Sequence, residues 1–358
     1  MQVILVNPRG FCAGVRMAID VVDQVLDVFP GQTIFVYHEI VHNKHVVNRF
    51  KDRGVVFVED LSEVPSGAVV VFSAHGISPA VRQDADARGL TAIDATCPLV
   101  TKVHSEAVRY AEQGYQILLI GHRDHQEVVG TFGEAPEAIQ VVERPEDIAG
   151  LTIHDPDRLV YLTQTTLSTD DAGVVIDALR QAFPNLKAPP SEDICYATTN
   201  RQHAVRLLAP ECDLVLVVGS ENSSNSKRLQ EIAENVGTRA RLIDDASQID
   251  PAWFVEMIQR VPTVREGSEP RILLTAGASA PEDLVAGICR YLVERFDARL
   301  FTGSVTEEAV EFGLPLALKR AMRDRGIDPE ARRIRVESPR VVEAEYGGDA
   351  VELTIEGR

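Results

Sequence analysis

The amino-acid sequence predicts an α/β fold built from three similar units around a central cavity. Short uninterrupted apolar runs alternate with longer amphipathic stretches, which is the pattern of parallel strands buried on both faces and joined by helices. A block centred on a cysteine also occurs three times, at intervals of roughly 85 to 100 residues. This interval is too long for a solenoid and indicates three repeated α/β domains.

The expected strands are apolar runs, each followed by a loop rich in Gly, Ser, Thr, His or Asn and then by a helical pattern. Residues 3–6, which precede Cys12, begin the first unit. In chain order the expected strands are residues 3–6, 34–37, 69–73, 117–121, 159–162, 214–219 and 272–276.

The repeat divides the chain into residues 1–96, 97–194 and 195–298, and a segment near residues 300–320 is expected to complete the first unit. Residues 321–358 form a C-terminal extension. It begins basic and ends in alternating apolar and polar residues around Gly347-Gly348, which predicts a β-hairpin.

Composition excludes several classes of protein. The 358 residues carry 36 basic and 54 acidic side chains, a net charge of −18, which argues against a general nucleic-acid binder. No apolar run approaches the roughly 18 residues that span a bilayer, and no basic region precedes the first apolar run as in a secretory signal. Five cysteines, an odd number, do not form a disulfide framework in a chain of this length. We therefore expect a cytoplasmic protein with reduced thiols and no membrane partner.

Three thiols occupy equivalent positions between a strand and a helix: Cys12, Cys97 and Cys195. Ligands of parallel α/β sheets bind beyond the carboxyl ends of the strands, so three inward-facing units would direct these loops into one cavity. Helix N-termini favour the thiolate, the form that binds metal. Three converging thiols would leave one iron of a four-iron cluster open to a substrate oxygen. The alternative for each is a buried small hydrophobic residue, and we expect that for Cys212 and Cys289, which break the repeat.

Imidazoles and hydroxyls occupy the other loops of the repeat. Donors beside helix N-termini suit an anionic phosphate group without needing lysine or arginine. The candidate substrate-binding residues are His42, His75, His125, Ser223, Ser224, Asn225 and Ser279.

Glu127 and Thr165 lie in the loops of the second unit. A carboxyl group partly buried next to imidazoles can deliver protons, and a neighbouring hydroxyl can orient or relay them. A solvated surface charge for Glu127 and a helix N-cap for Thr165 remain alternatives at this point.

A zinc site is the competing interpretation. Residues 38–42 read HEIVH, the H-E-x-x-H pattern of zinc proteases, which requires a helix so that both imidazoles face one side. Here the motif directly follows an expected strand, where a helix is not predicted. The alternative functions are a zinc-dependent hydrolase acting on a small phosphorylated substrate and a non-catalytic phosphate-binding module.

Nine co-linear motifs resemble those of the 4-hydroxy-3-methylbut-2-enyl diphosphate reductases, the IspH/LytB family, from residue 1 to about residue 318. They are NPRGFCAGV, EIVHN, FSAHG, DATCPLVTKVH, the GHxxHxE loop, TQTTLS, CYATTNRQ, GSENSSNS and TAGASAP.

The resemblance implies the last step of the methylerythritol phosphate route. A two-electron reductive dehydroxylation gives isopentenyl and dimethylallyl diphosphate there. It also implies one [4Fe-4S] cluster per subunit, with Cys12, Cys97 and Cys195 as ligands of three irons and the substrate hydroxyl on the fourth. Glu127 would be the proton donor and Thr165 would position the substrate hydroxyl. The three histidines, with Ser223 to Asn225 and Ser279, would hold the diphosphate.

The same resemblance implies a reduced ferredoxin or flavodoxin as electron donor, and it is compatible with either a monomer or a homodimer.

Two features depart from the family pattern. Gln126 stands where the family usually has proline, which removes a constraint on φ beside Glu127. The chain also continues beyond residue 320, near which family members usually end.

Overall fold

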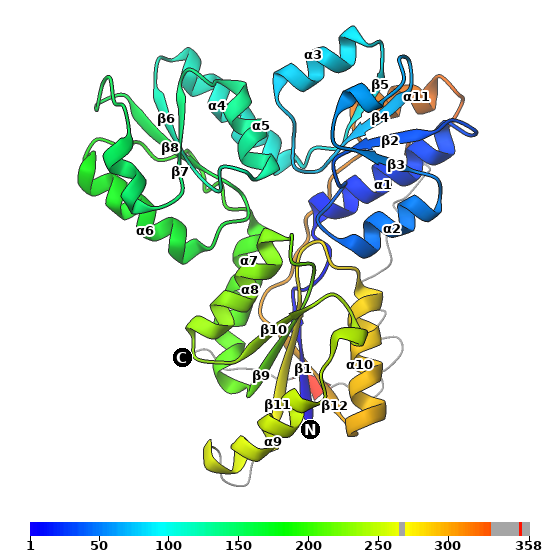
Figure 1. Ribbon diagram of the computed structural model, residues 1–358, viewed down its shortest axis with the longest axis vertical. Helices are drawn as coiled ribbons and strands as arrows, with labels where there is room; N and C mark the ends of the chain where they lie inside the picture. The colour runs from blue at the N-terminus through cyan, green and yellow to red at the C-terminus, as the bar shows by residue number, and fades with distance from the viewer. Residues whose placement is uncertain (265–268, 331–350, 353–358) are drawn as a thin grey trace.

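The computed structural model describes residues 1–264, 269–330 and 351–352 of the chain. It has the expected α/β fold, with three parallel sheets in three lobes that meet at the centre in a trefoil-like arrangement (Figure 1). Among the described residues, no helix is long and apolar enough to cross a membrane.

The first lobe contains a four-stranded sheet of order β3-β2-β4-β5. Its central strand β4 is buried at every position, as its uninterrupted apolar sequence predicts. One face packs against α1, α2 and α11, and the other packs against α3. The elements of this lobe are α1 (Ala13–Val28), β2 (Ile34–Tyr37), α2 (Lys44–Asp52), β3 (Val56–Val58), η1 (Leu61–Glu63), β4 (Val69–Phe72), α3 (Pro79–Ala87), β5 (Thr91–Asp94) and α11 (Leu316–Arg323).

The second lobe contains a three-stranded sheet of order β7-β6-β8. Helices α4 and α5 cover one face, and α6 covers the other. The elements are α4 (Pro98–Glu112), β6 (Gln116–Ile120), α5 (Gln126–Glu134), β7 (Ile139–Val142), η2 (Pro145–Gly150), β8 (Leu159–Thr163) and α6 (Thr169–Ala182).

The third lobe contains a six-stranded sheet of order β10-β9-β11-β1-β12-β13. Helices α9 and α10 pack on one face and α7 and α8 on the other. The elements are β1 (Gln2–Asn7), α7 (Tyr196–Leu208), η3 (Ala209–Glu211), β9 (Leu214–Val218), α8 (Ser224–Asn235), β10 (Ala240–Ile243), η4 (Ala246–Gln248), α9 (Ala252–Val264), β11 (Arg271–Ala276), α10 (Glu282–Phe296), β12 (Arg299–Ser304) and β13 (Val351–Glu352).

The position of β1 shows that one predicted domain boundary is wrong. The sequence repeat placed residues 1–96 together in the first unit, but β1 belongs to the sheet of the third lobe. β1 is hydrogen-bonded on both sides to strands of the third lobe, with Val3 in register with Ile272 of β11 and with Leu300 of β12. An apolar run shows that a strand is buried, but it does not show which strands flank it. The chain therefore starts in the third lobe and enters the first at α1.

The segment after β12 returns to the first lobe. Leu318 and Met322 of α11 are fully buried in the core formed by α1 and the first sheet. The predicted hairpin of the extension lies outside the described residues, apart from Val351 and Glu352, which pair in parallel with β12.

Several helices begin at polar residues of the loops that face the centre of the molecule. Cys12, His125, Cys195 and Ser223 each occupy an N-cap position, where the side chain accepts a hydrogen bond from a backbone N–H of the first turn. Cys12, His125 and Ser223 follow β1, β6 and β9 and therefore lie at the carboxyl ends of these strands, where the lobes meet. Cys195 instead follows α6, with no strand between α6 and α7 in the described part of the chain, so the prediction that a strand precedes this cysteine is wrong.

Candidate functional site

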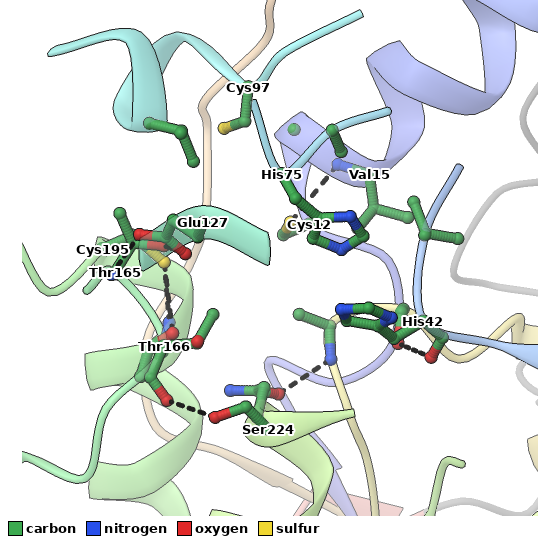
Figure 2. A pocket seen from close by; sticks show the side chains of 18 of the residues that line it. Cys12, Val15, His42, His75, Cys97, Glu127, Thr165, Thr166, Cys195 and Ser224 are labelled. Atoms are coloured by element: carbon green, nitrogen blue, oxygen red, sulfur yellow. Dashed lines mark hydrogen bonds between the residues drawn. The ribbon is translucent and has the colours of Figure 1, made fainter. Parts of the chain in front are cut away.

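One cavity at the junction of the three lobes collects every candidate residue. Its volume is about 700 Å³, including the solvent at its mouth. Figure 2 shows the thiols and imidazoles of the labelled residues around an open centre. The predicted residues that line it are Cys12, His42, His75, Cys97, His125, Glu127, Thr165, Cys195, Ser223, Ser224, Asn225 and Ser279.

The three thiols of the cavity each precede a helix. Cys12 caps α1 and its Sγ accepts the Val15 N–H at 3.5 Å. Cys195 caps α7, where its Sγ accepts the Thr198 N–H at 3.4 Å and lies 3.2 Å from the Thr198 hydroxyl. Cys97 occupies the same position before α4, without a side-chain cap bond.

Close approach of the first two thiols requires Gly14. A Cβ at this position would lie 2.5 Å from Cys97 Sγ and 4.0 Å from Cys12 Sγ. A side chain there would fill the space between the two sulfurs. Glycine therefore allows the first turn of α1 to reach the thiol of the second lobe.

The thiol pKa values differ from the expectation based on helix N-termini. Burial and, to a smaller extent, the neighbouring Cys12 raise the pKa of Cys195 to about 11. Burial and Cys12 also raise the pKa of Cys97 well above the ordinary value. Burial raises these pKa values more than the helix N-terminus lowers them, because the thiolate loses more free energy of hydration than it gains from the helix dipole. The raised pKa values of Cys97 and Cys195 disfavour their thiolates unless a cation compensates the charge, which fits ligands of a positively charged metal group.

The zinc interpretation is not supported. Among the described residues, no three His, Cys, Asp or Glu side chains gather closely enough to ligate one metal ion. Zinc requires its ligand atoms within about 2.3 Å of a single centre. His38 has φ of 61° and lies outside any helix, and its Nδ1 contacts Glu59 Oε2 at 2.5 Å. His38 and His42 therefore do not form the helical pair that the HEIVH motif needs.

Three imidazoles form one wall of the cavity. The His42 and His75 rings are stacked with centroids 3.9 Å apart, and His125 meets them edge-on at 5.5 and 6.1 Å. Burial, together with the other histidines, lowers the pKa of His75 well below its usual value and that of His125 to about 3. A bound anion would reverse this effect, because opposite charge favours the protonated imidazole.

One nitrogen of each imidazole is already engaged. His42 Nδ1 lies 3.4 Å from Glu39 Oε2, and His75 Nδ1 lies 3.2 Å from the Ser73 hydroxyl. His125 Nδ1 accepts the Glu127 N–H at 3.2 Å, so the neutral ring carries its proton on Nε2. His125 therefore presents a fixed donor.

A second, adjoining wall comes from the N-terminus of α8 and the loop after β11. Ser279 Oγ donates to the His42 carbonyl at 2.9 Å, and Ser224 Oγ donates to the Thr166 carbonyl at 3.3 Å. Asn225 Oδ1 accepts the Ala278 N–H at 2.9 Å. The Asn225 Nδ2 donor is buried without a hydrogen-bond partner. A buried unsatisfied donor beside a helix N-terminus fits an oxygen of an anionic ligand.

Glu127 and Thr165 form a buried pair. The Thr165 N–H donates to Glu127 Oε1 at 2.6 Å, and the Thr165 hydroxyl lies 3.0 Å from Oε2. Burial raises the pKa of Glu127 to about 7, although both hydrogen bonds lower it. The alternatives from sequence are wrong for both residues: Glu127 is 2% exposed, and Ser168 is the N-cap of α6.

Sequence reasoning missed two threonines of the cavity, Thr166 and Thr198. The position of Thr198 three residues after Cys195 matches the spacing of a capping contact and could have indicated it. Cys212 and Cys289, as predicted, lie in the hydrophobic cores of the third lobe and not in the cavity.

Fold and cavity together define a three-lobed α/β protein whose central site combines three half-buried thiols, an imidazole wall and a buried carboxyl group. Residues 3–293 match the LytB protein family. A 4-hydroxy-3-methylbut-2-enyl diphosphate reductase of Rhodopirellula baltica is 53% identical over 319 residues, which cover 89% of this chain and 96% of that relative. The chain belongs to the LytB protein family.

Solved structures agree with this assignment. The E-1-hydroxy-2-methyl-but-2-enyl-4-diphosphate reductase of Plasmodium falciparum superimposes with a TM-score of 0.82 at 37% identity, covering 91% of this chain and 99% of that one. A structure described as (E)-4-hydroxy-3-methyl-but-2-enyl diphosphate reductase, the terminal enzyme of the non-mevalonate pathway, matches with a TM-score of 0.58 at 30% identity, covering 82% of this chain and all of that one.

Proposed function

We propose that this protein is a 4-hydroxy-3-methylbut-2-enyl diphosphate reductase. The reaction takes up two electrons and two protons, breaks the allylic C–O bond, and releases water together with isopentenyl or dimethylallyl diphosphate. The observation that carries the proposal is the convergence, in one cavity, of three half-buried thiols, an anion-binding wall and a carboxyl group with a raised pKa.

The diphosphate binds between the imidazole wall and the N-terminus of α8. No lysine or arginine occurs among the described residues that line the cavity, so uncharged donors and imidazoles must hold the anion. Support comes from the unsatisfied Nδ2 of Asn225 and from the low pKa of His75 and His125, which a bound anion would raise. The binding residues are His42, His75, His125, Ser223, Ser224, Asn225 and Ser279.

Cys12, Cys97 and Cys195 hold three irons of one [4Fe-4S] cluster per subunit. Burial raises the pKa of Cys97 and Cys195, so these two thiols stay protonated until a metal group compensates the thiolate charge. When bound there, the cluster supplies electrons and a Lewis-acidic iron.

Glu127 delivers the proton to the leaving hydroxyl group. Its carboxyl is protonated for a substantial fraction of the time near neutral pH because burial raises its pKa to about 7. The Thr165 hydroxyl, which lies 3.0 Å from Glu127 Oε2, orients the carboxyl and the substrate hydroxyl.

The electrons come from a reduced ferredoxin or flavodoxin, and the enzyme acts as a monomer or a homodimer. Analytical ultracentrifugation of the purified protein distinguishes the two assemblies. Reduction rates with each purified donor protein identify the partner.

Anaerobic purification followed by metal and sulfide analysis tests the proposed function. We expect iron and acid-labile sulfide in equal amounts, and conversion of the hydroxylated diphosphate by the reduced protein. Zinc without sulfide would indicate the hydrolase instead. Diphosphate binding without any metal would indicate a phosphate-binding module.

A further inference from the structure

Helix α5 carries two glycines on the face that meets the first lobe. Gly130 and Gly133 lie three residues apart and therefore on the same side of the helix. A glycine inside a helix costs about 1 kcal/mol relative to alanine, so two in a nine-residue helix need a structural reason.

The reason at Gly133 is the closeness of the two lobes, because a Cβ there would lie 2.4 Å from Ser78 Cβ of the first lobe. A Cβ at Gly130 would lie 3.3 Å from His104 Cε1 of the same lobe and 3.4 Å, an ordinary contact distance, from the Gly76 carbonyl carbon of the first lobe. The loop 76–78 of the first lobe thus rests directly on the backbone of α5. By contrast, a Cβ at Gly173 in α6 would meet nothing within 4 Å.

A partly buried polar network spans the same contact. His104 of α4 contacts Glu134, the last residue of α5, with Nδ1 2.8 Å from Oε1. Arg82 of α3 in the first lobe donates to the same carboxylate oxygen at 3.1 Å. The His104 ring also packs against Gly76, where a Cβ would lie 3.0 Å from Nε2. Glu134 therefore links the second lobe to the first directly beside the glycine contact.

Both sides of this contact are connected to the cavity by very short segments. His75 immediately precedes Gly76, and Glu127 lies one helical turn before Gly130. A change in the gap between the lobes would therefore move His75 relative to His125, whose ring centroids are 6.1 Å apart, and relative to Glu127. Displacements of about 1 Å at a reacting centre can cost about 10²-fold in rate.

We propose that Gly130 and Gly133 are positioning residues that set the distance between the His75 loop of the first lobe and the N-terminus of α5, which carries His125 and Glu127. This inference rests on the proposed function for the roles of those three side chains. According to this proposal, the close contact between the lobes positions the side chains of the site in addition to packing the two lobes together.

The test compares Gly133→Ala, Gly130→Ala and the double variant Gly133→Ala/Ser78→Gly in the cluster-bearing enzyme. Ser78 makes no side-chain capping bond, so its replacement removes the opposing Cβ at little cost to α3. Gly173→Ala is the matched control, because it is a helical glycine of the same lobe with open space around it. Each variant is measured for kcat, KM, the Kd of inorganic pyrophosphate by calorimetry, iron content and melting temperature.

We expect Gly133→Ala to lower kcat by roughly tenfold or more and to weaken pyrophosphate binding, with a smaller effect for Gly130→Ala, whose contact is looser. The double variant should recover most of both losses, and Gly173→Ala should keep wild-type kinetics. If Gly133→Ala does not fold, Gly130→Ala and the double variant still decide the question.

Wild-type kcat, KM and pyrophosphate affinity in Gly133→Ala and Gly130→Ala, with a lower melting temperature alone, would overturn the proposal, since the glycines would then serve packing only. Failure of Ser78→Gly to restore the double variant would overturn it as well. A wild-type protein that binds pyrophosphate but does not reduce the substrate would refute the proposed function, while the pyrophosphate series would still test the positioning role.

Discussion

Glu127 receives two hydrogen bonds from a single residue, Thr165, one from the backbone N–H to Oε1 and one from the hydroxyl to Oε2. The two oxygens are thereby held in one orientation inside a site where the carboxyl is almost completely buried. Burial raises the carboxyl pKa and the hydrogen bonds lower it, and the net result is a pKa of about 7. The pair thus combines a fixed direction with a transferable proton.

Replacing Glu127 by glutamine keeps the shape of the side chain and removes its ionisable proton. We expect normal iron content, nearly normal pyrophosphate affinity and turnover lower by about 10²-fold or more, the usual scale for loss of a positioned proton donor. Anaerobic steady-state kinetics with a small chemical reductant measure the effect. Turnover within a fewfold of the wild type would exclude Glu127 as the donor.

The pH dependence of turnover provides the second check on this residue. Since burial raises the pKa of Glu127 to about 7, its carboxyl is protonated below that pH and ionised above it. A proton donor must carry its proton, so wild-type kcat should fall as the pH rises through about 7. Glu127→Gln should lack this transition. A wild-type profile that stays level across the transition would contradict the assignment.

Thr165→Val should separate the hydroxyl contact from the backbone contact. The valine variant keeps the N–H donor but leaves Glu127 Oε2 without its hydroxyl partner, a loss worth about 1–3 kcal/mol for a buried group. We expect turnover roughly tenfold lower or more, and a higher pKa for Glu127 in the pH profile because the ionised form loses a hydrogen bond. Thr165→Ser, which retains the hydroxyl, serves as control. An equal loss of turnover in Thr165→Val and Thr165→Ser would show that the hydroxyl has no role in the mechanism.

Serine replacements distinguish the three thiols of the cavity from the two in the cores. Cys12→Ser, Cys97→Ser and Cys195→Ser should each lose iron, sulfide and activity together, because a serine hydroxyl is a poor substitute for a thiolate ligand. Cys212→Ser and Cys289→Ser should keep all three, with some loss of stability from their buried positions. Iron loss in Cys212→Ser as large as in Cys97→Ser would refute the ligand set.

Much of the site could be predicted from the sequence because its residues follow strands. A loop after a buried parallel strand lies at the carboxyl edge of its sheet, so the repeat alone placed His42, His125 and Ser223 at equivalent positions. The thiol pKa values could not be predicted this way. Their direction depends on how deeply Cys97 and Cys195 are buried, which only the packed lobes determine.

The fold was predictable where strands are central and apolar, and less so at edges and between lobes. β3, β7 and β10 lie at the outer edges of their sheets, are three or four residues long, and are only partly buried, so they leave a weak apolar signal. The pairing of β1 with β11 and the contact of Gly133 with Ser78 join distant parts of the chain. A local sequence pattern does not indicate which distant segment a residue will contact.

A buried ion pair joins segments next to two of the thiols, and its loss should destabilise the protein. Arg201 is completely buried, and its guanidinium donates to the Gly10 and Ala197 carbonyls and to Glu308. Glu308→Ala would leave this charge without its counter-ion, which typically costs about 3–5 kcal/mol. Chemical denaturation of the purified protein measures the loss. The exposed neighbour Glu307→Ala should change little, and equal effects of the two variants would show that the pair contributes no special stability.

The basic part of the C-terminal extension supports a prediction about the electron donor. Residues 319–340 carry eight basic and four acidic side chains, in a chain with a net charge of −18. Residues 331–340, with Arg332, Arg333 and Arg335, lie outside the described residues, and a role in docking stays a prediction from sequence. Ferredoxins and flavodoxins are typically acidic, so a local basic patch would offset the repulsion between donor and enzyme at short range.

Reversing Arg332, Arg333 and Arg335 to glutamate tests that role. Turnover driven by a protein donor should fall, and it should fall more at low ionic strength, where charges are less screened. Turnover driven by a small chemical reductant should not change, because that reductant needs no docking surface. Reversal of three exposed acidic residues elsewhere, Glu112, Asp177 and Glu234, to lysine provides the matched control and should not slow the protein donor. Equal effects of the arginine reversals in both assays, or none in either, would exclude this stretch as the docking site.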